Sequence, residues 1–153
     1  LIRSIPAFVQ IVTFQTTSGK PYFVFERRPN FSGWKTLSGM GDVEGPYPKL
    51  SLPKVRWGLG PASLLAVEVA QGGRMRLIMS CYTSVPNQEV AVRLDGKRIA
   101  VHALPATGKA YRFETPLHPS PGPHRIELVY KDWARDHPNG PLAVLFAELR
   151  LER

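Results

Sequence analysis

The sequence predicts an all-β protein, an antiparallel β-sandwich of the jelly-roll type. Apolar and polar residues alternate along most of the chain, and turn residues recur about every eight to twelve positions. No segment keeps a helical period of about 3.6 residues for long enough to predict a helix. The 153 residues suffice for one domain with its own core. The absence of an internal repeat excludes a propeller or a solenoid.

The chain begins with two predicted strands, 7–15 and 21–27, which the segment "TTSGK" joins into a hairpin. A region rich in proline, glycine and aromatic residues follows at 28–61 and is predicted to be irregular. Its stretch "EGPYPKLSLPKVRWGLGP" is too broken for a helix and too apolar for a free linker. We expect this stretch to wrap an edge of the sandwich, where its prolines prevent pairing with other chains.

The remaining strands form the predicted core region, 62–152. They are expected at 62–70, 74–82, 89–96, 98–104, 110–117, 124–133 and 142–152. The dipeptide Asp95-Gly96 joins two of them and suits a type I′ turn, in which glycine accepts a positive φ. The last strand is apolar on both faces at "LAVLF", so we expect it in a covered, central position.

Alternation also assigns the two faces of single strands. In "RMRLIMSCY", Leu77, Met79 and Cys81 point one way, whereas Ser80 and Tyr82 point the other. One buried face and one wet face are typical of antiparallel sheet.

The whole chain, 1–153, is interpreted as a single sandwich domain cut from a larger protein, because it opens "LIRSIPAF" without a Met or a leader pattern. No apolar run of about eighteen residues occurs, so no membrane-spanning segment is predicted. The single cysteine, Cys81, excludes an internal disulfide and leaves the compartment open. A secreted or cell-surface location is slightly favoured.

The net charge of +8, from 20 Lys and Arg against 12 Asp and Glu, favours polyanionic partners. These include nucleic acid, an anionic membrane surface and an acidic polysaccharide. The basic residues are scattered along strands rather than gathered in a block, which equally fits a solvated strand face. Nucleic acid is disfavoured, because the chain has more strands than an OB-fold and carries no RRM or KH signature.

No pattern of a metalloenzyme, a nucleophile elbow or a phosphate-binding loop occurs, so no catalytic residue is predicted. Asp42 and Glu44 stand two apart in "GDVEGP" and are the candidates for a carboxylate pair or a Ca²⁺ site. Such pairs are common in loops by chance. We therefore predict no cofactor, and Asp42 and Glu44 leave only a structural calcium ion open.

Aromatic residues in or beside predicted loops indicate a binding surface. Flat rings pack on the C–H faces of sugars, while neighbouring acids, amides and guanidinium groups bond the hydroxyls. Alternatively, each Trp plugs an end of the sandwich. The candidate ligand-binding residues are Trp34, Tyr47, Tyr82, Asp132, Trp133 and Arg135.

Three segments, "EGPYP" with "LPKVRW", "VRLDGKRIA", and "GPHRIELVYKDW" with "PLAVLFAELRLE", resemble accessory β-sandwich domains of the galactose-binding-like kind. Such domains are appended to bacterial glycoside hydrolases and glycosyltransferases. The resemblance covers 33–152 and leaves the hairpin at 7–27 outside. It implies a non-catalytic module that binds a polysaccharide or an oligosaccharide. The main alternative is a structural domain that packs against a neighbouring catalytic domain. An enzyme, such as a lyase or hydrolase on a jelly roll, is the third reading and would need a cleft with a perturbed acid or base.

Overall fold

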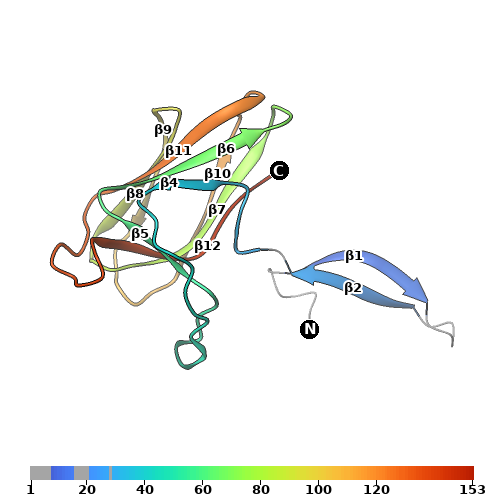
Figure 1. The fold of residues 1–153 in the computed structure, drawn as a ribbon, viewed down its shortest axis with the longest axis horizontal. Helices are drawn as coiled ribbons and strands as arrows, with labels where there is room; N and C mark the ends of the chain where they lie inside the picture. Colours follow the sequence, from blue (N-terminus) through green and yellow to red (C-terminus); the bar gives the residue numbers. More distant parts are fainter. Residues whose placement is uncertain (1–7, 16–20, 28) are drawn as a thin grey trace. The chain divides into compact units, whose positions relative to one another are not determined.

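The computed structural model describes residues 8–15, 21–27 and 29–153. Contacts divide the chain into two compact units, Leu1–Asn30 and Phe31–Arg153. The regular elements of the described residues are strands, apart from one short 3-10 helix (Figure 1). The predicted all-β class is therefore confirmed. Among the described residues, no helix is long and apolar enough to span a membrane.

The first unit contains an antiparallel hairpin of β1 (Phe8–Gln15) and β2 (Pro21–Arg27). Both strands agree with the alternation of the sequence. The predicted turn at 16–20 and the first predicted strand residue, Ala7, lie outside the described residues.

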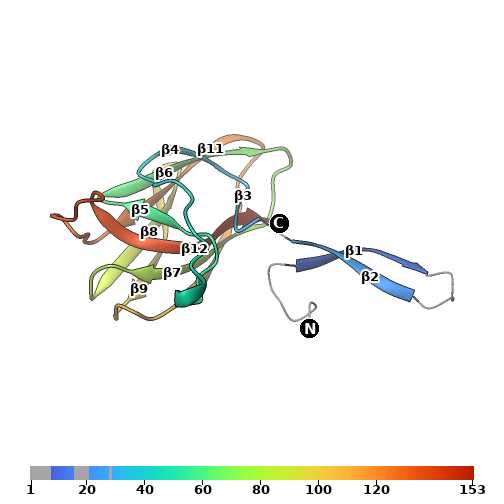
Figure 2. The same cartoon turned by 60° about the horizontal axis from the view of Figure 1, so that its bottom comes forward.

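The second unit is a sandwich of two five-stranded sheets, of the predicted jelly-roll type (Figures 1 and 2). Every described strand pairing in it is antiparallel except that of the two-residue strand β3 with β12. The β7 sheet consists of β10 (Tyr111–Leu117), β7 (Met75–Thr83), β12 (Leu142–Glu152), β5 (Arg56–Leu59) and β3 (Phe31–Ser32). The β6 sheet consists of β4 (Lys35–Ser38), β6 (Ala62–Val69), β11 (Gly122–Tyr130), β8 (Gln88–Leu94) and β9 (Lys97–Leu104).

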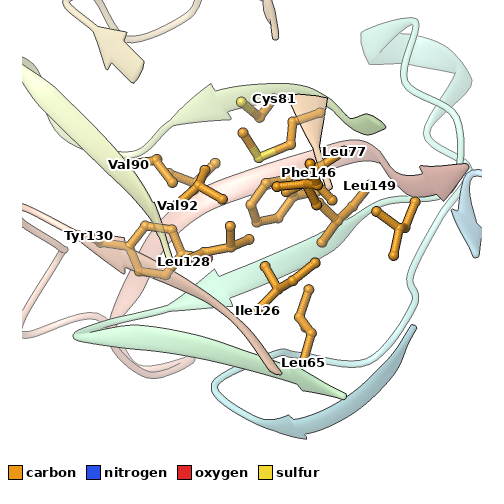
Figure 3. Close-up of a cluster of buried hydrophobic side chains, with 14 of the residues drawn as sticks. Leu65, Leu77, Cys81, Val90, Val92, Ile126, Leu128, Tyr130, Phe146 and Leu149 are labelled. Atoms are coloured by element: carbon orange, nitrogen blue, oxygen red, sulfur yellow. The ribbon is translucent and has the colours of Figure 1, made fainter. Parts of the chain in front are cut away.

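The core fills the space between the two sheets (Figure 3). Leu65 of β6, Leu128 of β11 and Phe146 of β12 are fully buried in it. Leu77 and Cys81 of β7 point the same way, as their alternation predicted. Because burying one such large apolar side chain contributes about 1.5–3 kcal/mol, this cluster holds the sheets together.

Strand β12 has the central position that its apolar run predicted. It pairs with β7 along one edge and with β5 and then β3 along the other. Neighbouring strands therefore flank Leu142–Phe146 on both edges, and the facing sheet covers its inner face.

The region 28–61 differs from the irregular loop that was expected. It contains the strands β3, β4 and β5 and the short 3-10 helix η2 (Pro48–Leu50). Between β4 and β5 the chain forms a two-stranded arm that projects from the sandwich instead of wrapping its edge (Figures 1 and 2). Backbone hydrogen bonds between Glu44 and Val55 and between Tyr47 and Leu52 hold the arm. Prolines recur in this segment and restrict φ. The residues that pair are not prolines, so they keep the backbone N–H groups that these hydrogen bonds need.

Candidate binding groove

A groove of about 800 Å³ lies at the end of the β6 sheet where β6 ends and β4 and β11 begin. Its walls come from these three strands, from the residues before β4, and from the turn between β8 and β9. The residues that line it are Gly33, Trp34, Lys35, Leu37, Ala66, Val67, Glu68, Asp95, Pro123, His124 and Arg125.

The groove exists because a small side chain lies between two long ones. In the sheet register, Ala66 of β6 lies opposite Lys35 of β4 on one side and Arg125 of β11 on the other. Leu65 and Val67 are buried toward the core, so Ala66 points to the outer face. Its methyl group leaves the space between the two cationic side chains open and forms the floor.

The indole of Trp34 forms the wall next to β3. Its Nε1 donates a hydrogen bond of 2.8 Å to the carbonyl of Leu149, and the guanidinium carbon of Arg56 lies 5.2 Å from a ring centroid. Gly33 has a φ of +86°, and a Cβ there would lie 2.3 Å from the carbonyl oxygen of Leu151. Only glycine permits this approach to β12. Trp34 is thus a half-buried side chain in a fixed position, and it packs against the core as the alternative reading of each Trp expected.

The turn between β8 and β9 supplies a wall beside the start of β11. Asp95 Oδ2 lies 2.6 Å from His124 Nδ1, and Asp95 Oδ1 accepts a hydrogen bond of 2.9 Å from the backbone N–H of Arg125. His124 Nε2 lies 2.6 Å from the carbonyl oxygen of Ser120. The hydrogen bond with His124 lowers the pKa of Asp95, and the same bond raises the pKa of His124.

The groove therefore combines donors, acceptors and apolar surface. Lys35 and Arg125 offer N–H donors, and the carboxylates of Glu68 and Asp95 offer acceptors. Leu37, which is 49% exposed, adds an apolar edge. A ligand with several hydroxyl groups and an apolar face has partners for both in this arrangement.

The predicted carboxylate pair lies on the arm. Asp42 and Glu44 are exposed there, and Glu44 faces the phenol of Tyr47. Partial desolvation, and then the charge of Glu44, raise the pKa of Tyr47. In the part of the chain that the structure describes, no group of three or more His, Cys, Asp or Glu side chains is placed to hold a metal ion. The calcium site thus stays a prediction.

Of the six predicted binding residues, Trp34 alone is among those that line the groove. Tyr47 is 38% exposed on the arm. Tyr82 lies opposite Leu145 of β12, and its orientation on the outer face of the β7 sheet follows from the burial of Cys81 and Thr83 beside it.

The outer face of the β7 sheet carries a closed ring of alternating charges around Ile78. Each arginine of the ring pairs with two glutamates at 4.0 Å or less, and each glutamate with two arginines. Ile78 itself is buried, and so are most of Arg150 and Glu148. The Arg–Glu ring consists of Arg76, Glu114, Arg112, Glu148, Arg150 and Glu152.

Asp132, Trp133 and Arg135 lie together just beyond the end of β11, whereas the groove is at its start. The Arg135 guanidinium lies 4.1 Å from a Trp133 ring centroid, and its Nη2 is 3.6 Å from Asp132 Oδ1. A Cβ on Gly60 would lie 2.3 Å from the indole. Trp133 packs against the core and covers this end of the sandwich. Its predicted ligand role stays a prediction.

Sequence reasoning did not single out Lys35, Glu68 or His124 for binding. The Asp95-Gly96 turn was predicted, but that prediction did not reveal that the sheet register would bring these residues to one groove.

No protein-family model matches the chain, and no curated protein matches it. Its fold is similar to that of a family 35 carbohydrate-binding module from an environmental isolate, with a TM-score of 0.54 and 11% sequence identity over 79% of this chain and 87% of that one. The C-terminal family 6 module of a marine laminarinase from Zobellia galactanivorans aligns with a TM-score of 0.49 and 12% identity, over 77% of this chain and 93% of that one. The family 35 likeness confirms the predicted jelly-roll sandwich.

Proposed function

We propose that this chain is a non-catalytic carbohydrate-binding module and that the groove on the β6 sheet is its binding site. The observation that carries the proposal is the groove itself, in which a fixed indole and an alanine floor lie among two cations and two carboxylates. The jelly-roll fold, shared with a family 35 carbohydrate-binding module, supports the same assignment.

Each part of the groove matches a need of sugar recognition. A pyranose ring offers C–H faces to Trp34 and the methyl of Ala66, and hydroxyl pairs to Lys35, Glu68 and Arg125. Because Trp34 is held by its bond to β12, stacking on it costs little side-chain entropy. We propose a polysaccharide as the ligand, neutral or acidic.

The absence of catalysis is part of the proposal. The thiol of Cys81 is buried, and burial raises its pKa to about 12, so it is a poor nucleophile. Tyr130 is also buried, and burial raises its pKa, so its hydroxyl stays protonated. A calcium ion at Asp42 and Glu44 would be structural.

Affinity electrophoresis in gels that contain barley β-glucan or glucuronoxylan tests the proposal at low and at moderate salt. We expect one polysaccharide to retard the protein, and the Ala66→Leu variant to lose this retardation because leucine fills the groove floor. Ala91→Leu is the matched control, since Ala91 lies on the same face of the β6 sheet but not in the groove. If both variants were retarded as strongly as the wild type, the groove would not be the binding site.

Salt separates two kinds of binding. Retardation that survives moderate salt fits stacking and hydrogen bonding, whereas binding to glucuronoxylan that disappears with salt indicates attraction of a basic protein to a polyanion. Retardation by neither polysaccharide would contradict the proposal.

The second candidate function is a structural domain that packs against a catalytic neighbour. The exposed apolar side chains of the arm favour it: Val43 is 48% exposed and Leu50 is 68% exposed. This candidate predicts no retardation by either polysaccharide.

A further inference from the structure

Both nitrogens of the His124 ring face oxygen atoms. Nδ1 lies 2.6 Å from Asp95 Oδ2, and Nε2 lies 2.6 Å from the carbonyl oxygen of Ser120. The ring is largely enclosed, with its side chain 10% exposed. It thereby connects the turn between β8 and β9 with the segment before β11. We call Asp95, His124 and Ser120 the histidine clamp.

The clamp requires a proton on each ring nitrogen. A carbonyl oxygen only accepts hydrogen bonds, so Nε2 must donate to Ser120. Asp95 already accepts a hydrogen bond from the N–H of Arg125, which favours the ionised carboxylate, so Nδ1 must also donate. A neutral ring has one N–H and leaves a nitrogen lone pair against an oxygen. The ring must then withdraw from one partner.

The clamp is part of the groove wall, because Asp95, His124 and Arg125 all line the groove. The charged groups near the ring are Asp95 on the turn, Glu68 on β6 and Arg125 beside it on β11. Both carboxylates favour the protonated ring, whereas Arg125 has its backbone N–H bound to Asp95. Loss of the proton therefore loosens the wall that the ligand contacts.

We propose that the protonation of His124 regulates the groove, so that ligand affinity is highest at mildly acidic pH and falls when the ring loses its proton. This inference rests on the proposed function.

The test is calorimetric titration of the full chain with barley β-glucan and with glucuronoxylan between about pH 5.5 and about pH 8.5. We expect the polysaccharide that binds to do so roughly fivefold more weakly at the upper pH, the effect of one lost hydrogen bond. NMR of the ring nitrogens should show His124 losing its proton over the same interval as the affinity falls.

The decisive variant is Asp95→Asn. The asparagine oxygen can still accept from Arg125, while its NH₂ group donates to the unprotonated Nδ1 of a neutral ring. Asparagine also tolerates the φ of +50° at this position. We expect this variant to bind at the upper pH more tightly than the wild type and to lose the decline with pH.

His118→Gln is the matched control, because His118 is exposed and does not line the groove. This variant should keep the wild-type pH profile. Binding by the wild type with a flat profile, or an Asp95→Asn variant with an unchanged decline, would overturn the regulation and leave the proposed function standing. No binding at any pH would overturn both.

Discussion

Replacement of Gly58 by alanine tests how closely the two sheets are packed. Gly58 lies on β5, and a Cβ there would be 2.1 Å from the hydroxyl oxygen of Tyr130 on the facing sheet and 2.8 Å from Cε2 of Phe146. Both aromatic side chains are buried, and the Tyr130 hydroxyl is 2.7 Å from Ser63 Oγ. Neither ring can move into solvent, so Gly58→Ala must strain the core.

The magnitude follows from these contacts. Overpacking a core costs about 1–3 kcal/mol, and displacing the Tyr130 hydroxyl from Ser63 costs about 0.5–1.5 kcal/mol. Alanine regains about 0.5–1 kcal/mol over glycine within a strand. We expect a net loss of roughly 2 kcal/mol in the free energy of unfolding.

Urea unfolding followed by tryptophan fluorescence measures this loss. Tyr130→Phe removes the atom in closest contact, so the double variant should be less destabilised than the sum of the single ones, by about 1 kcal/mol. Gly41→Ala is the control, since a Cβ there makes only ordinary contacts, the nearest at 3.6 Å. A Gly58→Ala protein as stable as the wild type, or strictly additive effects, would refute the reasoning.

Three further predictions concern charge and hydrogen bonding. Glu148→Gln removes one of the two glutamate charges that pair with the nearly buried Arg150 and should cost about 2 kcal/mol in urea unfolding, against less than about 1 kcal/mol for Glu127→Gln in an exposed pair. Equal costs would contradict this dependence on burial. Trp34→Phe loses the hydrogen bond to β12 and should reduce the free energy of unfolding by about 1 kcal/mol, and a neutral result would show that the bond is not needed. The raised pKa of His124 gives stability that is complete below the ordinary value of 6.5 and is lost as pH rises through the raised pKa. The lowered pKa of Asp95 gives stability that is present above 3.8 and is lost as pH falls through the lowered pKa. Thermal unfolding should thus show the clamp's contribution as greatest between these two values, and the same dependence on pH in Asp95→Asn would argue against this assignment.

The sequence by itself determined the class of fold and most of the strands. Alternation at Leu77, Met79 and Cys81 identified a half-buried strand, because a strand has a period of two and its apolar side must meet another layer. The two-sided apolar run of β12 indicated its central position for the same reason. The Asp95-Gly96 turn could also be predicted from the sequence, because its backbone needs a positive φ.

The region 28–61 shows where local patterns were insufficient. Its strands are two to four residues long, too short for alternation to be recognised. They form because β12 and β6 present edges with unpaired backbone groups, and pairing satisfies these groups. The two-stranded arm likewise depends on pairs such as Glu44 with Val55, which become visible only once the chain is folded.

Only the tertiary structure decided the candidate site. Lys35, Ala66 and Arg125 belong to three strands, and the register of the β6 sheet alone sets them side by side. A shift of one residue would send Ala66 into the core and close the groove. Likewise, Asp95 and His124 are ordinary surface residues in the sequence and form a clamp because β8 pairs with β11. Short-range patterns fix which way a side chain points, whereas long-range pairing fixes which side chain it meets.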